Sequence, residues 1–257
     1  MTELSRQFTE DAFLGGKLRL RQLKSGHRAG HDAMLLAAAT SAQTGDRVAD
    51  LGAGVGAAGL ALAKRVAGIE LVLVEIDATL AEMARGNAVA NAIAADVIVL
   101  DVTSAAAEFA AAGLIADSVD VVLMNPPFND ATRHRASPDK ARVSAHVATG
   151  VTLVGWIHAA RRILKSGGVL TLIWRADGLA ELLAALDRGF GSLAILPVHG
   201  DATSPAIRVL VRAIKGGKAP LHMHAALILN SEAAMPDQQV QDILAGEGVL
   251  PLAIQCR

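Results

Sequence analysis

The chain has 257 residues, and its 24 lysines and arginines nearly balance 25 aspartates and glutamates, giving a formal net charge of −1. Hydrophobic residues make up 52% of the chain, enough for a large core, but they form no continuous run of the length, about 18 residues, that a membrane-spanning helix needs. The single cysteine, Cys256, excludes an intrachain disulfide and a cysteine-built zinc site, and residues 1–20 show no signal-peptide pattern. We therefore expect a cytoplasmic protein.

Strands and helices alternate along most of the chain. Apolar runs predict strands at 46–51, 69–77, 96–101, 118–124 and 169–174, with two or three more among 193–199, 206–214 and 222–229. Helices are predicted at 32–43, 60–67, 79–91, 152–168 and 178–189. This alternation is typical of an α/β fold with a doubly wound, mostly parallel, seven-stranded sheet. The last two strands, joined by the turn at 215–220, are expected to pair as an antiparallel C-terminal hairpin.

We expect one domain spanning residues 1–257. An N-terminal extension at 1–45 would pack on a core at 46–230, and a helical tail would follow at 231–257. Charge is distributed unevenly, because residues 15–31 carry five lysines and arginines and no acid. Such a distribution permits a basic face on a neutral protein, although an ordinary solvated surface fits it as well.

A glycine-rich segment, DLGAGVGAAG at 50–59, follows the first core strand. Residues 54–59 match the dinucleotide fingerprint G-x-G-x-x-G. Residues 50–56 also match the acidic-x-Gly-x-Gly-x-Gly loop of methyltransferases that use S-adenosylmethionine (SAM), through Asp50, Gly52, Gly54 and Gly56. A pyrophosphate favours backbone amides at a helix N-terminus, whereas the sulfonium and ammonium groups of SAM favour nearby carboxylates.

Carboxylates end three consecutive predicted strands, at Asp50, Glu75 and Asp101. The carboxyl ends of such strands point into the ligand crevice of a doubly wound sheet. There Glu75 can accept hydrogen bonds from ribose hydroxyls, Asp101 can accept one from an adenine amino group, and Ile76 can lie against the adenine ring. Each acid taken singly fits a helix cap or a solvated charge equally well. The three together favour SAM over a dinucleotide.

The fourth strand ends in Asn125-Pro126-Pro127-Phe128. Together with the glycine loop, this sequence resembles the Asn/Asp/Ser-Pro-Pro-aromatic motif of amino-group methyltransferases, which modify planar nitrogens. The side-chain oxygen of Asn125 and the carbonyl of Pro126 can each accept one hydrogen of an exocyclic amine, which aims its lone pair at the methyl group. The prolines hold that carbonyl rigidly, and Phe128 offers a face for an unstacked base.

Two flanking stretches, 10–39 and 204–230, resemble the bacterial adenine-N6 methyltransferases that act on a valine tRNA. The resemblance implies that the N-terminal segment closes over SAM, with Arg28, Gly30, His31 and Asp32 near its methionine end. Asp32 equally fits a helix N-cap. Phe128 departs from the family pattern, because related members often have tyrosine there.

A basic segment follows the Asn125 motif and contains no periodic apolar face. Candidate phosphate contacts are Arg133, Arg135, Lys140 and Arg142 in this loop, and Lys215 and Lys218 in the late turn. The histidines show no ligand spacing for a metal, and none is expected.

We therefore predict a SAM-dependent N-methyltransferase with a Rossmann-like fold. It would transfer the methyl group to adenine N6 of a tRNA and release S-adenosylhomocysteine. Guanine N2 of an rRNA and a glutamine side chain of a protein are alternative acceptors, although 45 residues are short for the helical substrate domain of the glutamine enzymes. A SAM-binding module without catalysis and an NAD-dependent oxidoreductase are the alternatives of other classes, and the sequence lacks an evident hydride-transfer acid for the latter.

Overall fold

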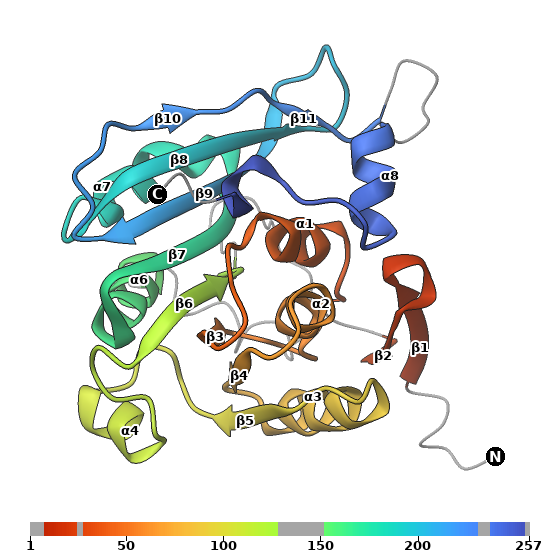
Figure 1. The fold of residues 1–257 in the computed structure, drawn as a ribbon, viewed down its shortest axis with the longest axis vertical. Helices are drawn as coiled ribbons and strands as arrows, with labels where there is room; N and C mark the ends of the chain where they lie inside the picture. The colour runs from red at the N-terminus through yellow and green to blue at the C-terminus, as the bar shows by residue number, and fades with distance from the viewer. Residues whose placement is uncertain (1–7, 25–27, 128–151, 231–236, 255–257) are drawn as a thin grey trace, which may run out of the picture.

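The computed structural model describes residues 8–24, 28–127, 152–230 and 237–254, and within these ranges the strands form two sheets. The smaller sheet pairs β1 (Phe8–Phe13) with β2 (Leu18–Leu23) in antiparallel fashion. The larger has the order β10-β8-β9-β7-β6-β3-β4-β5, with β11 also paired to β8 (Figure 1). Its strands are β3 (Arg47–Leu51), β4 (Glu70–Glu75), β5 (Ala95–Val99), β6 (Val119–Met124), β7 (Leu164–Arg175), β8 (Phe190–His199), β9 (Ala206–Lys215), β10 (His222–Met223) and β11 (Leu227–Ile228).

The seven longer strands, β3 to β9, form the mostly parallel sheet predicted from the sequence. Strands β3 to β7 pair in parallel, and β9 runs antiparallel to both β7 and β8. The parallel strands are nearly continuous apolar runs because helices cover both faces of the sheet. The predicted doubly wound α/β fold is confirmed.

The antiparallel hairpin joins different strands from those expected. It consists of β8 and β9, whereas β10 and β11 pair in parallel with β8. The prediction that 206–214 pairs with 222–229 is therefore wrong. Both edges of β9 are already occupied, by β7 and β8, so the chain after Lys215 crosses to the remaining edge of β8.

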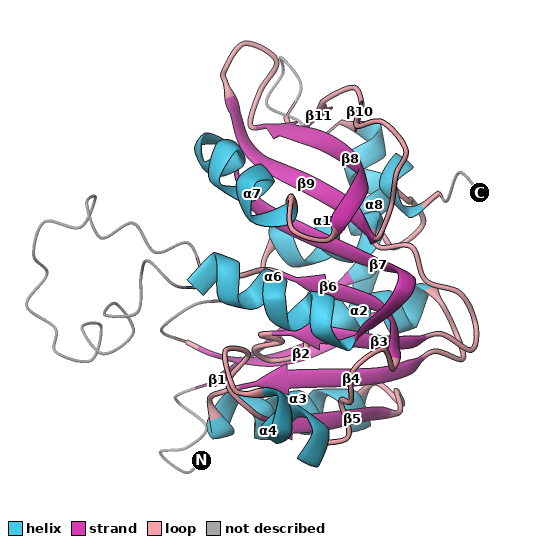
Figure 2. Cartoon of the chain, turned by 90° about the vertical axis from the view of Figure 1, so that its left-hand side faces the viewer, coloured by secondary structure: helices cyan, strands magenta, loops and turns pink. Residues whose placement is uncertain are grey.

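Helices cover the sheet on two sides, with α1, α2 and α3 on one face and α4, α6 and α7 on the other (Figures 1 and 2). Each face has its own buried apolar cluster. The helices are α1 (His31–Ala39), α2 (Ala57–Arg65), α3 (Ala78–Ala90), α4 (Ala106–Ala111), α6 (Thr152–Ile163), α7 (Leu179–Leu186) and α8 (Gln238–Leu244). Single 3₁₀ turns occur at η2 (Leu14–Gly16), η3 (Ala176–Gly178) and η4 (Pro251–Ala253). None of the helices in the described ranges is long and apolar enough to span a bilayer.

Helix α6 ends five residues earlier than the sequence suggests, at Ile163 rather than at the Gly-Gly pair. Leu164 instead begins β7 and pairs with Val119 of β6, where its side chain is fully buried. Lys165 donates to a carboxylate oxygen of Asp120 at 2.6 Å. Tertiary pairing with β6 thus overrides the helical propensity of this segment.

Asn87 of α3 and Asn91, the C-cap residue of that helix, attach the N-terminal hairpin to the rest of the fold. Asn87 accepts from the amide of Arg21 at 2.8 Å and donates to its carbonyl at 3.1 Å, and it also donates to the carbonyl of Val55 at 2.9 Å. Asn91 accepts from the amide of Arg19 at 2.9 Å and donates to its carbonyl at 2.6 Å. The two amide side chains satisfy the backbone of β2 as a neighbouring strand would.

We expect Asn87→Ala to lower the free energy of unfolding by about 1–3 kcal/mol, because it leaves the part-buried backbone groups of Arg21 and the buried carbonyl of Val55 without their partner. Urea unfolding measures the change. The matched control is Asn230→Ala, which removes one exposed hydrogen bond to the carbonyl of Gly200. Equal losses in the two variants would contradict the proposed attachment.

Candidate active site

The carboxyl ends of three neighbouring strands, β4, β3 and β6, lie side by side at the same level. Leu51 of β3 pairs with Val74 of β4 on one side and with Met124 of β6 on the other. The next residue of each strand therefore emerges together with the others, and these residues are Gly52, Glu75 and Asn125. Neighbouring strands are about 4.8 Å apart, so the backbones of Glu75 and Asn125 lie about 10 Å apart across β3.

The glycine loop after β3 is fastened to β4. The amides of Gly52 and Ala53 both donate to the carbonyl of Val74, at 2.8 and 2.9 Å. The amide of Gly54 donates to Oε2 of Glu75 at 2.7 Å. Gly54 has a φ of +56°, and the space where a side chain would project is open. A ligand can therefore approach the backbone of this loop closely.

Asp50 is 2% exposed, and its Oδ2 accepts from the amide of Gly59 at 2.8 Å. Burial raises the pKa of Asp50 to about 7, against the lowering effect of the Gly59 hydrogen bond, and the charge of Glu75 raises it further. The hydrogen bond joins the end of β3 to the first turn of α2. The sequence did not reveal this partner, and a contact between Asp50 and the cofactor stays a prediction.

Glu75 is 7% exposed, and its Oε1 accepts from the amide of Asp77 at 2.9 Å. Asp101 lies at the surface, where its Oδ1 accepts from the amide and the hydroxyl of Thr103, both at 2.7 Å. Ile76 is 63% exposed. Two carboxylates and one uncovered apolar side chain thus follow neighbouring strands, an arrangement that fits the ribose and adenine of a nucleoside.

Asn125 directly follows β6, and its Oδ1 is buried without a hydrogen-bond partner among the described residues. Pro126 is buried and Pro127 is exposed. A buried acceptor that lacks a partner costs free energy, about 1–3 kcal/mol. This oxygen is therefore suited to a donor brought by a ligand. Phe128 and the predicted loop contacts lie outside the described residues; those contacts are Arg133, Arg135, Lys140 and Arg142.

Asp32 does not cap α1, as one interpretation of the sequence suggested, because Gly30 occupies the N-cap position. Its Oδ2 instead accepts from Nε of Arg208 in β9 at 2.9 Å. Arg28 donates to a carboxylate oxygen of Asp11 at 2.7 Å. The proximity of Asp32 to the cofactor stays a prediction.

Lys215 lies near the amino ends of the parallel strands, whereas Asn125 follows the carboxyl end of β6. Lys215 donates to Asp117 at 2.7 Å and to the carbonyl of Leu164 at 2.6 Å, both near the amino ends of parallel strands. Lys218 is exposed in the turn that follows. An RNA that touched both lysines and Asn125 would have to span the full length of the strands.

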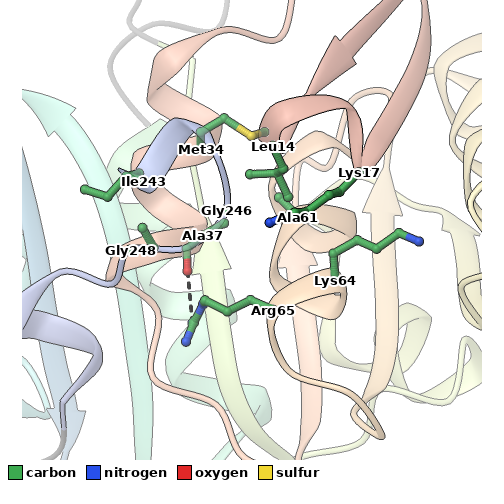
Figure 3. A pocket seen from close by; sticks show the side chains of 11 residues that line it. Leu14, Lys17, Met34, Ala37, Ala61, Lys64, Arg65, Ile243, Gly246 and Gly248 are labelled. Atoms are coloured by element: carbon green, nitrogen blue, oxygen red, sulfur yellow. Dashed lines mark hydrogen bonds between the residues drawn. The ribbon is translucent and has the colours of Figure 1, made fainter. Parts of the chain in front are cut away.

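Figure 3 shows a small cavity between α1, α2 and α8. Its volume is about 90 Å³, below the range of about 300–1,000 Å³ that ligand sites usually have. The cations on its wall bond to backbone carbonyls, Lys64 to Asn91 and Arg65 to Ala37. Asn125 and the other strand-end residues are not among the residues that line this cavity.

Comparison with known proteins assigns the chain to a family. Residues 25–199 match the model of the methyltransferase small domain. The fold is that of a SAM-dependent methyltransferase, as predicted, whereas the roles of the strand-end residues stay predictions. The chain belongs to the methyltransferase small domain family, and its cofactor is SAM.

Relatives and solved structures of similar proteins support the assignment. The chain is 30% identical to the tRNA1(Val) (adenine(37)-N6)-methyltransferase of Erwinia tasmaniensis over 72% of its own length and 74% of that protein. It is 35% identical to the predicted O-methyltransferase Atu636 of Agrobacterium tumefaciens, with a TM-score of 0.71 and coverage of 85% and 98%. The Thermus thermophilus 16S rRNA N2 G1207 methyltransferase, solved with SAM and guanosine, shares the fold at 23% identity and a TM-score of 0.57, over 81% of this chain and 50% of that one.

We expect the stability of the protein to depend on pH through Asp50. Folding raises the pKa of Asp50 from its ordinary value of 3.8 to about 7, so the folded state holds the proton more tightly. The resulting stabilisation is complete below about pH 4 and is lost as the pH rises towards 7. Asp50→Asn cannot titrate and should gain stability relative to the wild type over this interval, by a few kcal/mol.

Urea unfolding of both proteins without ligand, at pH 4.5, 6 and 7.5, measures this difference. A difference in unfolding free energy that stays constant across the three pH values would contradict the assignment.

Proposed function

We propose that the protein transfers a methyl group from SAM to an exocyclic amino nitrogen, namely N6 of an adenine in a tRNA. The observation that carries the proposal is the buried Oδ1 of Asn125, which has no hydrogen-bond partner among the described residues and lies level with Glu75 and the glycine loop. It supplies a hydrogen-bond acceptor beside the place where the loop and Glu75 would hold the cofactor.

The chemistry requires positioning more than acid–base catalysis. The lone pair of an exocyclic amine is delocalised into its ring, which makes the nitrogen a weak nucleophile. Oδ1 of Asn125 and the carbonyl of Pro126 would each accept one of its hydrogens and turn the lone pair towards the sulfonium. SAM, when bound, supplies the electrophilic methyl group. The nitrogen becomes strongly acidic as the new bond forms, so water can take the proton.

The cofactor would be held by residues from three strand ends. Glu75 would accept from the ribose hydroxyls, Asp101 from the adenine amino group, and Ile76 would cover the adenine ring. The glycine loop would admit the ligand against its backbone at Gly54, where the space is open. Asp50 would favour the positive charge of SAM from beneath the loop.

The pair of acceptors selects nitrogen over oxygen. An amino group has two hydrogens and can satisfy both Asn125 and Pro126, whereas a hydroxyl group has one and would leave an acceptor unpaired. The name of the Erwinia relative supports a tRNA adenine. Guanine N2 of an rRNA offers the same two hydrogens and is the second candidate.

A cytoplasmic RNA would be bound mainly through its phosphates, because aromatic residues make up 3% of the chain and cannot form a broad stacking surface. We assign these contacts to the cationic loop after Pro127, with Phe128 stacking on the target base. Contacts with Lys215 and Lys218 would need an RNA that extends from the carboxyl ends of the strands to their amino ends.

The test is transfer of labelled methyl groups from SAM to total tRNA that lacks this modification, followed by nucleoside analysis. We expect N6-methyladenosine with the wild type and a loss on the order of 10²–10³-fold in turnover with Asn125→Ala. Asn125→Asp keeps an acceptor oxygen and should retain part of the activity. Binding of SAM, measured separately, should be nearly unchanged.

Asn230→Ala serves as the control and should behave as the wild type. If methylated guanosine formed in place of methylated adenosine, the methyl acceptor would be guanine N2 and not adenine N6. Full activity of Asn125→Ala would remove the proposed role of this residue.

A further inference from the structure

Trp156, in the second turn of α6, lies directly against the glycine loop. If Gly52 carried a Cβ atom, its nearest neighbours would all belong to the six-membered ring of Trp156. That Cβ would be 2.8 Å from Cζ3 and 3.5 Å from Cζ2, and closer still to Cη2. The ring therefore rests on the Cα of Gly52, and only glycine at this position leaves room for it.

The same turn of α6 also touches the loop after β5. A Cβ atom at Gly155 would lie 3.3 Å from the methyl group of Thr103. Thr103 in turn donates its amide and its hydroxyl to Asp101. One helical turn thus packs against both the Gly52 loop and the Asp101 turn, the two segments that lie on either side of Glu75 in the sheet order.

Trp156 is more exposed than a core residue. Trp174, the other tryptophan of the chain, is 4% exposed and belongs to the buried cluster on this face. Trp156 packs against the same cluster but is only half-buried. Part of its surface therefore remains exposed.

We propose that Trp156 is a positioning residue for SAM and forms the wall of the cofactor crevice on the α6 side. The amides of the glycine loop donate hydrogen bonds to Val74 and Glu75 and so fasten the loop to β4. The indole of α6 packs on Gly52 and adds a second contact to the same loop. It thereby limits the freedom of a glycine whose φ is +73° and keeps the loop at a fixed separation from the Asp101 turn. The inference rests on SAM as cofactor and not on the identity of the methyl acceptor.

Tryptophan fluorescence tests the position of the indole directly. The chain contains two tryptophans and no tyrosine, so each single substitution leaves one emitter. In Trp174→Phe, the emission of Trp156 should change on titration with S-adenosylhomocysteine and saturate at the dissociation constant given by equilibrium dialysis. In Trp156→Phe, the emission of Trp174 should stay constant over the same titration.

Binding measurements separate positioning from bulk stability. Trp156→Ala should weaken S-adenosylhomocysteine binding about tenfold, equivalent to about 1.4 kcal/mol, and Trp156→Phe should restore part of the loss because a ring again covers Gly52. Val154→Ala is the matched control, since Val154 lies on the same helix with 59% exposure and should leave binding unchanged.

Unchanged emission of Trp156 at saturating ligand, or wild-type affinity in Trp156→Ala, would overturn the proposal. If Trp156→Ala does not fold, the fluorescence of Trp174→Phe decides alone. Because no methyl acceptor is present, a failure here is distinguishable from a failure of the proposed RNA methylation, which leaves binding of S-adenosylhomocysteine intact.

Discussion

Strand β3 pairs in parallel with β4 on one side and with β6 on the other. This pairing determines where the other parts of the site lie. Leu51 faces Val74 and Met124 across the two ladders, so the chain leaves all three strands at one level. A shift of one residue in either ladder would turn the buried side chains of that strand to the wrong face, and the apolar clusters on both sides of the sheet oppose it. The level alignment of Glu75 and Asn125 is therefore a consequence of core packing.

The site retains polar groups that a fold selected for stability alone would avoid. Asp50 is buried near the charge of Glu75, and its pKa is raised to about 7. The Oδ1 of Asn125 has no partner among the described residues. Both features cost folding free energy, and both lie at the strand ends to which we assign the cofactor and the amine in our proposal. The large apolar core of the sheet offsets these costs.

Elements far apart in the sequence surround these strand ends and contact the loops that follow them. The N-terminal hairpin attaches through Asn87 of α3 and through Asn91, the C-cap residue of α3. Asn87 also donates to the carbonyl of Val55 within the glycine loop. Arg208 of β9 ties the first turn of α1 through Asp32. Helix α6 reaches the loop through Trp156. The glycine loop is thus fastened to β4, to α3 and to α6 by contacts of different kinds.

The sequence by itself determined the local features: apolar runs predicted the strands, glycine spacing predicted the loop, and acids at strand ends together with Asn125-Pro126 indicated a SAM-dependent amino-group methyltransferase. These features are readable because each depends on a few neighbouring residues. The tertiary structure alone decided which strands pair, where α6 ends, and which partners Asp32 and Lys215 take. Those outcomes depend on which sheet edge is already occupied and on contacts between distant segments, such as Gly52 with Trp156. A linear pattern does not contain that information, because the free energy that decides it comes from packing in the assembled fold.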